Sequence, residues 1–159
     1  MTIVEDDIEL PNGHETKYIY QANTHDAVTV IATDQGNILI QQEYSYPPDL
    51  TMYQFPGGGI EADEEPMQAA LRELKEESGY TGEPSYLGFY YTNNRRSNAK
   101  MHVVLVNNTT ECTKEGGDIE EFITSEWVST DKLRSMMGSG EIVNYSILAG
   151  MSLYDAHFR

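Results

Sequence analysis

The sequence predicts an α/β fold in which helices sandwich a mixed β-sheet. Runs of strand length that are rich in β-branched residues alternate with turn residues over most of the chain. One segment of helical periodicity, residues 66–78, interrupts these runs, and helical patterns return only near the C-terminus. The length of 159 residues is enough to bury a core, so a single domain over residues 1–159 is expected.

Residues 1–22 are predicted to form an N-terminal extension of antiparallel strands. Pro11-Asn12-Gly13 is a strong turn signal, and it separates Ile3–Leu10 from a second apolar segment at Tyr18–Tyr20. The expected structure of this extension is a β-hairpin.

A second hairpin is predicted where a β-branched run, Ala27–Thr33, meets a tight turn at residues 34–37. Ile38–Tyr44 is the returning strand. Pro47-Pro48 ends this strand, and the residues that lead to Tyr53 are expected to form a loop.

The helix predicted at Pro66–Ser78 has clear ends. Proline is favoured at the first helical position, and Gly79 stands just past the last one, where glycine is favoured. Apolar residues recur along the helix at i, i+3, i+4 and i+7 and are expected to face the core. These residues are Met67, Ala70, Leu71 and Leu74.

Three further strands and two helices are predicted after this helix. The strands are expected near residues 85–91, 101–107 and 122–128. Thr130 and Asp131 are candidate caps of a short helix that ends near Met137. The last helix is predicted over residues 143–154.

The formal net charge of −16 limits the partners of this protein. A surface this acidic repels the phosphates of nucleic acids and of anionic membranes, so neither is expected as a partner. It also repels an anionic small substrate unless bound cations reverse the field locally.

A cytoplasmic location is expected from three features of the sequence. The N-terminus is acidic where a signal peptide is basic and then apolar, and no apolar run approaches the ~18 residues that span a bilayer. The single cysteine, Cys112, excludes an internal disulfide and a cysteine-only zinc site.

Three carboxylates share one face of the predicted helix, because Glu73, Glu76 and Glu77 recur at i, i+3 and i+4. The centre of this face lies about 115° around the helix from the apolar stripe. Carboxylates packed this closely repel one another, so a positive group is expected among them. Arg72, four residues before Glu76, is one candidate, and a hard divalent cation is a better one. Taken alone, the segment also fits a solvated, glutamate-rich helix face.

Mg²⁺ or Mn²⁺ suits this predicted site better than zinc, since the available ligands are carboxylate and backbone carbonyl oxygens. The segment Gly57-Gly58-Gly59 precedes the helix and allows the backbone to approach such an ion closely.

The spacing of glycines and charged residues between Gly58 and Tyr80 decides between a metal site and a solvated face. These residues are Gly58, Glu64, Arg72-Glu73, Glu76-Glu77 and Gly79. At every one of these positions the chain resembles the Nudix box. The single departure is Tyr80, where the family usually has an aliphatic residue. The resemblance favours the metal site.

Resemblance to the Nudix family implies an α/β/α sandwich and an enzyme that uses Mg²⁺, or Mn²⁺, to hydrolyse a phosphoanhydride bond. The substrate would be a nucleoside diphosphate linked to another group. The implied metal ligands are Glu73, Glu76, Glu77 and a carbonyl of Gly57 or Gly58. Arg72 is implied to orient the glutamates, Glu76 to belong also to the catalytic group, and Glu64 to be an auxiliary acid.

Beyond the box, the chain more weakly resembles the ADP-ribose pyrophosphatase branch of the family. The segments that carry this resemblance are Leu10–Gly13, Gln42–Tyr44, Gln54–Gly58, Glu120-Glu121, Trp127–Ser129 and Gly140–Ile142. The branch implies ADP-ribose or a related nucleotide sugar as substrate, with a nucleoside monophosphate and a sugar phosphate as products. It also implies a homodimer in which the N-terminal strands cross to the partner.

Two other functions stay open. One is hydrolysis of a (deoxy)nucleoside triphosphate or a dinucleoside polyphosphate. The branch often has Arg-Gln-Tyr-Arg where residues 41–45 of this chain lack arginine, and it usually has a Pro-Gly turn where this chain has Thr92–Ser97. The other is a non-catalytic, nucleotide-sensing domain, which is disfavoured because such domains generally lose box glutamates and this chain keeps them all.

The candidate substrate-binding residues are Tyr44, Arg95 and Arg96. Tyr44 lies before the box and could stack on a nucleobase, although an aromatic residue beside a sheet is more often part of the core. Arg95 and Arg96 are adjacent in a predicted loop and could bind a phosphate, or could simply offset local acidity.

The general base is predicted on the loop at residues 114–121, because the ADP-ribose pyrophosphatase branch carries a glutamate on a mobile loop at this place. Two glycines in this loop fit a mobile lid. Glu120 is the first candidate, Glu121 the second and Glu115 the third, and all three could instead be surface charges.

Overall fold

The computed structural model describes residues 2–22, 25–114 and 123–158. The strands are β1 (Thr2–Glu9), β2 (Glu15–Ala22), β3 (Ala27–Asp34), β4 (Asn37–Ser45), β5 (Leu50–Gln54), β6 (Tyr80–Tyr91), β7 (Lys100–Glu111) and β8 (Thr124–Ser129). The helices are α1 (Pro66–Ser78), α2 (Thr130–Ser139) and α3 (Tyr145–His157). None of the helices in the described ranges combines the length and the apolar character that a membrane-spanning helix needs.

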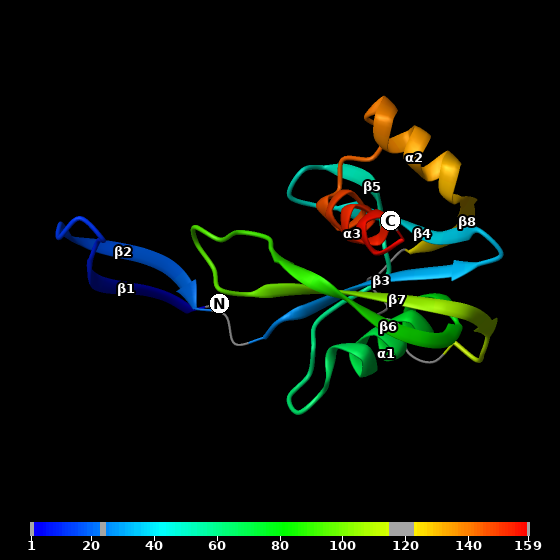
Figure 1. Ribbon diagram of the computed structural model, residues 1–159, viewed down its shortest axis with the longest axis horizontal. Helices are drawn as coiled ribbons and strands as arrows, with labels where there is room; N and C mark the ends of the chain where they lie inside the picture. Colours follow the sequence, from blue (N-terminus) through cyan, green and yellow to red (C-terminus); the bar gives the residue numbers. More distant parts are fainter. Residues whose placement is uncertain (1, 23–24, 115–122, 159) are drawn as a thin grey trace.

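A mixed sheet lies between two helical layers. β3 to β8 form a six-stranded sheet in the order β5-β4-β3-β7-β6, with β8 paired to β4, and β3 and β7 run parallel. Helix α1 covers one face of the sheet, and α2 and α3 cover the other (Figure 1). The predicted α/β sandwich with a mixed sheet is therefore confirmed.

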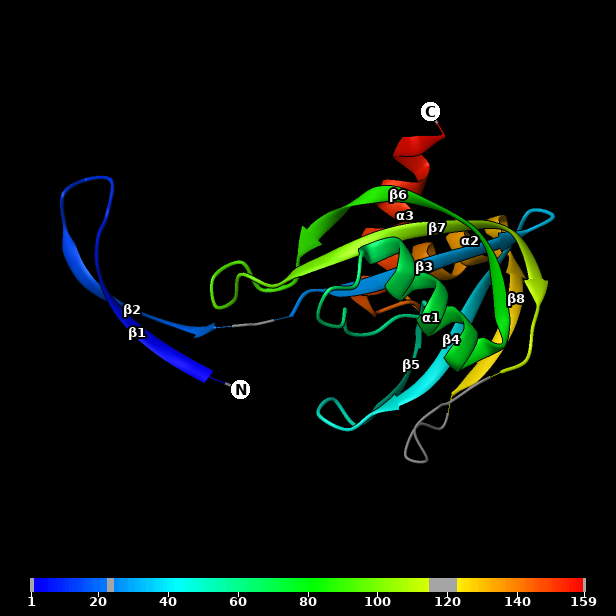
Figure 2. The same ribbon diagram turned by 90° about the horizontal axis from the view of Figure 1, so that it is seen from below.

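The antiparallel extension at the N-terminus is also present. β1 and β2 pair along their whole length and extend away from the main sheet as a separate ribbon (Figure 2). The ribbon is tied to the loop between β6 and β7, since Arg96 donates to the Ile19 carbonyl at 2.7 Å and Gln21 N donates to the Arg96 carbonyl at 2.7 Å. Ile3 and Ile19 keep 58% and 48% of their surface exposed, so the hairpin presents uncovered apolar surface.

The main sheet splits at β3, and the split fixes the segment before α1. β3 and β4 pair only beside their tight turn, after which β4 pairs with β5 and β8 instead. On the edge of β3 that β4 leaves, the segment at residues 56–60 takes the place of β4. Val30 N donates to the Pro56 carbonyl at 2.8 Å, and Val28 N donates to the Gly58 carbonyl at 2.9 Å. The glycine segment is thus held against β3 immediately before the helix begins.

Helix α1 has the predicted bounds because both of its ends are capped. Glu65 and Gln68 form a capping box at the N-terminus, where Pro66 occupies the first turn. Gly79, with φ of 74°, ends the helix and donates its N–H to the Lys75 carbonyl at 3.0 Å.

The buried face of α1 differs from the prediction. The buried residues are Ala69, Ala70 and Leu74. Met67 lies in the first turn and is 42% exposed, so the stripe is rotated toward Ala69. At about 100° per residue, the arc from Ala69 to Leu74 also contains Glu73 and Glu77. Two of the three carboxylates, those of Glu73 and Glu77, therefore lie on the sheet-facing side of the helix. The sequence predicts all three on a face separate from the apolar stripe.

Other elements also differ from the prediction. Strand β6 begins at Tyr80 rather than near Ser85, and β7 ends at Glu111 rather than near Asn107. Leu50–Gln54 is strand β5 rather than a loop, because its backbone pairs with β4 across the turn at Pro47-Pro48. Helix α2 is capped one residue earlier than predicted, since the Ser129 hydroxyl accepts from Lys132 N at 3.2 Å. Helix α3 begins at Tyr145, after its Asn144 cap.

Gly57 is required by the close approach of its backbone to β3. Its φ of +152° is unfavourable for other residues, and a Cβ at this position would overlap the main-chain carbonyl of Val28. Gly59, two residues later, has open space around its Cβ position. Substitution of Gly59 is therefore a matched control for substitution of Gly57.

Gly57→Ala is expected to lower the free energy of unfolding by at least about 2 kcal/mol, because backbone strain and overlap add to each other. Gly59→Ala is expected to change it by no more than about 0.5 kcal/mol. Urea unfolding of both variants measures this difference. Equal stability of the two variants would contradict the close packing of Gly57 on β3.

Candidate active site

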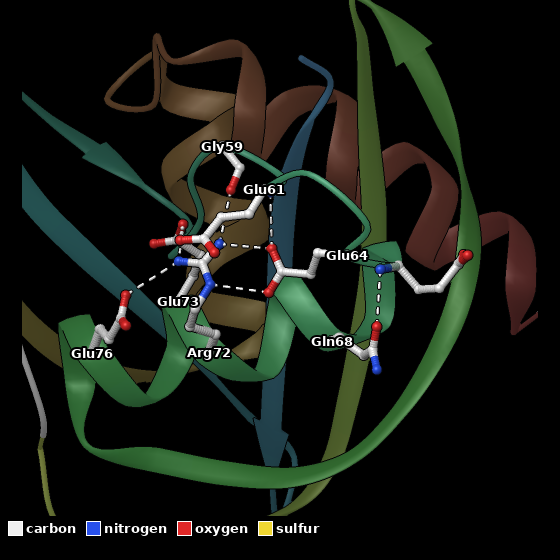
Figure 3. Close-up of polar contacts among 8 residues, drawn as sticks. Gly59, Glu61, Glu64, Gln68, Arg72, Glu73 and Glu76 are labelled. Atoms are coloured by element: carbon white, nitrogen blue, oxygen red, sulfur yellow. Dashed lines mark hydrogen bonds and ion pairs between the residues drawn. The ribbon is translucent and has the colours of Figure 1, made fainter.

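The guanidinium of Arg72 lies at the centre of the group that the sequence singled out (Figure 3). Its two contacts with Glu64 are 3.0 Å each, from Nε to Oε1 and from Nη2 to Oε2. Nη1 donates to Glu73 at 2.8 Å and to Glu76 at 3.2 Å, which confirms the predicted Arg72–Glu76 pair. Nη2 also donates to the Gly59 carbonyl at 2.8 Å. One side chain thus joins the glycine segment, the loop before α1 and the helix itself.

Glu73 is the most enclosed carboxylate of this group, with 13% of its side chain exposed. A Cβ on Gly58 would overlap its carboxylate, so the glycine segment packs directly on Glu73. Burial raises the pKa of Glu73, although the hydrogen bond from Arg72 acts in the opposite direction. The single guanidinium therefore compensates this buried carboxylate only in part.

The pKa of Glu64 shifts the other way. Its hydrogen bonds from Arg72 hold the pKa of the Glu64 carboxyl below its usual range, against the effect of burial. The same bonds raise the pKa of the Arg72 guanidinium above its ordinary value. Arg72 and Glu64 therefore form a charge-assisted ion pair with bidentate geometry.

Glu77 reaches the glycine segment from the last turn of α1. Its Oε2 accepts a hydrogen bond from Gly57 N at 3.2 Å. The structure thus places the carboxylates of Glu73 and Glu76 around the Arg72 guanidinium. The carboxylate of Glu77 lies beside the backbone of Gly57.

The donor set of this group fits a hard divalent cation. Every candidate ligand is an oxygen, and one guanidinium faces three carboxylates, so the group stays negative. Among the described residues, no three acidic, histidine or cysteine side chains already surround a common point. Arg72 stands between Glu73 and Glu76, which keeps those carboxylates directed at its own N–H groups.

The predicted substrate-binding residues lie in two other places. Tyr44 is half exposed near the end of β4, and its hydroxyl donates to Asp49 at 2.7 Å across the β4–β5 turn. Arg95 and Arg96 lie on the loop between β6 and β7, where the Arg96 guanidinium and the Arg95 carbonyl contact the N-terminal hairpin. None of these three contacts joins the residues to the glutamates of α1.

The predicted general bases Glu120 and Glu121, and the third candidate Glu115, lie outside the described residues. The described residues on either side of that segment are held by backbone pairing. Cys112 N donates to the Gly79 carbonyl at 2.8 Å, at the end of α1, and Thr124 pairs with Gln42 of β4.

A small cleft lined in part by the glycine segment was not predicted. Its volume is about 150 Å³, and it lies between the start of β3, the segment Gln54–Gly58 and the first turn of α3. Asn144 donates to the Gln54 side chain at 3.4 Å, and Ser146 accepts from Phe55 N at 3.4 Å. The sequence signals only the Gln54–Gly58 side of this cleft, because α3 is brought there by tertiary packing alone.

The NUDIX domain family model matches residues 23–149 of this chain. ADP-ribose pyrophosphatase of Bacillus subtilis (strain 168) is 30% identical over 139 residues, which cover 86% of this chain and 75% of that protein. ADP-sugar pyrophosphatase of Mus musculus is 41% identical over 63 residues, which cover 36% of this chain and 29% of that protein.

A solved structure described as "Crystal structure of ADP compounds hydrolase" has the same fold, with a TM-score of 0.87 over 97% of this chain and 84% of that one. At 19% sequence identity this likeness concerns the fold alone. The family model and the Bacillus relative cover most of the chain, and the box residues lie together on α1 and the segment before it. The chain therefore belongs to the Nudix family and is a pyrophosphohydrolase.

Proposed function

We propose that this enzyme hydrolyses the pyrophosphate of ADP-ribose or a related nucleotide sugar, releasing a nucleoside monophosphate and a sugar phosphate. The observation that carries the proposal is the group of α1 glutamates, of which Arg72 holds Glu73 and Glu76 and the glycine segment holds Glu77. The Bacillus and mouse relatives, which are named for ADP-ribose and ADP-sugar pyrophosphatase activity, support this choice of substrate.

Mg²⁺, with Mn²⁺ as a substitute, is the proposed cofactor, and Glu73, Glu76 and Glu77 are its proposed ligands. The carbonyls of Gly58 and Gly59 already accept hydrogen bonds from Val28 N and Arg72, which favours the Gly57 carbonyl as the backbone ligand. When bound, the cation neutralises pyrophosphate charge and acidifies water. On a chain of net charge −16, this reversal of the local field also allows an anionic substrate to approach.

The residues of the chain itself have separate proposed tasks. Arg72 orients Glu73 and Glu76, because its planar guanidinium fixes both carboxylates relative to the Gly59 carbonyl. The proton of the attacking water is taken by Glu120, with Glu121 and then Glu115 as the alternatives. Tyr44 is proposed to stack on the base, and Arg95 and Arg96 to contact phosphate.

A homodimer is proposed through the N-terminal hairpin. An isolated two-stranded ribbon is marginally stable, and this one leaves Ile3 and Ile19 half exposed. Covering these side chains on a second copy would stabilise the ribbon.

Glu77→Gln tests the metal assignment. The variant keeps the shape of the side chain but removes its charge, so kcat/KM for ADP-ribose is expected to fall at least about 100-fold, or ~3 kcal/mol, while the fold is kept. Release of AMP measures the activity, and circular dichroism checks the fold. Asp63→Asn, an exposed carboxylate in the loop before α1, is the control and should retain activity. Near-normal turnover by Glu77→Gln would refute the assignment.

A substrate panel tests the proposed substrate class. ADP-ribose, ADP-glucose, ATP and diadenosine tetraphosphate are supplied at equal concentration with Mg²⁺, and AMP and pyrophosphate are quantified. The fastest reaction is expected with a nucleoside diphosphate sugar, with AMP as a product. Release of pyrophosphate from ATP as the fastest reaction would instead favour a triphosphate pyrophosphatase.

Glu64→Gln tests the ion pair with Arg72. A carboxyl whose pKa is lowered in the folded protein stabilises it above the ordinary value of 4.5, and this contribution is lost as the pH falls through the lowered pKa. The variant is expected to lose on the order of 2 kcal/mol at pH 7, and to approach the wild type in stability in acid. Urea unfolding from pH 7 to pH 3 measures this, with Glu61→Gln as the exposed control. A constant difference across the range would contradict the pairing.

Ile19→Asp tests the proposed dimer. A charge in place of this exposed apolar side chain, directly opposite Glu5 in the hairpin, is expected to convert the dimer to a monomer. Light scattering after size exclusion gives the mass, and Asp7→Asn on the same hairpin should stay dimeric. A wild-type protein of single-chain mass at micromolar concentration would rule the dimer out.

A further inference from the structure

Gln41 is a buried polar side chain that the proposed mechanism leaves without a role. It lies on β4 with 0% of its surface exposed. In the described part of the chain, neither its Nε2 nor its Oε1 has a hydrogen-bond partner. Burial of an amide in this state opposes folding, because the hydrogen bonds it makes to water in the unfolded chain are not replaced. An apolar residue of similar size would be the more stable choice at this position.

The register of β4 shows which side of the sheet Gln41 faces. Leu39, two residues earlier, packs in one apolar cluster with Ala69, Ala70 and Leu74 of α1. Side chains alternate along a strand, so Gln41 faces the same side as Leu39. Residues directly opposite in an antiparallel pair also share a face, and Gln41 is opposite Gln54 of β5. Gln41 therefore lies on the face of the sheet that α1 covers.

The same side of α1 carries two of the box glutamates. Glu73 and Glu77 fall within the arc of the helix that is centred on its buried residues, and Glu77 accepts from Gly57 N. Gly57 follows Gln54 by three residues, and Gln54 is the partner of Gln41 in the sheet. The unpartnered amide and these two glutamates thus belong to the same layer, the amide on the sheet and the glutamates on the helix that covers it.

We propose that Gln41 is a positioning residue for the metal site, and that its amide hydrogen-bonds the hydration shell of the divalent cation held by the glutamates. This inference rests on the proposed function. Mg²⁺ keeps several of its waters when it binds carboxylates, and the O–H groups of those waters need acceptors. The Gln41 Oε1 supplies one, and it adds no negative charge to a group in which three carboxylates already face one guanidinium.

The proposal predicts opposite effects of one substitution on stability and on metal binding. Gln41→Leu has a similar volume and no polar atom, so in EDTA its Tm is expected to rise by about 2–4 °C. In the same protein, without substrate, the dissociation constant for Mn²⁺ is expected to rise about 10-fold, which is the typical effect of losing an outer-shell partner. Differential scanning calorimetry gives the Tm, and electron paramagnetic resonance of free Mn²⁺ gives the dissociation constant.

Two further variants keep the test decisive. Gln41→Met, with a more adaptable side chain, replaces Gln41→Leu if the branched residue does not fit, and the same pair of effects is expected. Leu39→Met, on the same face of β4, is the matched control and should leave the Mn²⁺ dissociation constant within twofold.

Three results would overturn the proposal. A lower Tm in EDTA for both Gln41 variants would mean that the amide has a structural partner. Unchanged Mn²⁺ binding in variants that are more stable would mean that the amide does not serve the cation. If the wild type itself bound no Mn²⁺, the proposed metal-dependent function would fail together with the role of Gln41. If the wild type bound Mn²⁺ and the Gln41 variants bound it equally well, only the role of Gln41 would fail.

Discussion

The hydrogen-bonded group around the Arg72 guanidinium is the constraint on which the rest of the site depends. Its N–H groups contact Glu64 in the loop before α1, Glu73 and Glu76 on the helix, and the carbonyl of Gly59. Three segments that could otherwise move independently are thereby fixed to one planar cation. The carboxylates would repel one another without it, and with it they stay close yet remain undercompensated. That residual negative charge is what makes the group suitable for a divalent cation.

The fold supplies the surroundings that this group needs. Because β3 leaves β4 after their turn, its edge is free to bind the segment at residues 56–60 through backbone hydrogen bonds. Gly57 lies so close to the main chain of Val28 that no side chain fits at its position, and a side chain at Gly58 would displace the carboxylate of Glu73. Helix α1 then starts and stops at fixed residues because both of its ends are capped. The position of the carboxylates thus follows from the backbone of β3 and the ends of one helix.

Local signals explain what the sequence could predict, and tertiary packing explains what it could not. Pro66 and Gly79 define α1 by their own backbone preferences, and the spacing of the box residues is enough to indicate the Arg72 group. The enclosure of Glu73 could not be predicted, because it depends on the glycine segment packing on its carboxylate and on a buried arc of α1 that extends to Ala69. The contact of Arg96 with Ile19, and the isolation of the Gln41 amide, arise from segments far apart in the chain.

The most direct test of the central claim is ³¹P NMR of the wild-type enzyme with ADP-ribose while Mg²⁺ is added to a metal-free sample. The account predicts that the diphosphate signals are converted to those of AMP and ribose 5-phosphate, at a rate that saturates with Mg²⁺ and falls to background on addition of EDTA. Conversion that proceeds equally well in EDTA, or intact ADP-ribose at saturating Mg²⁺, would contradict it.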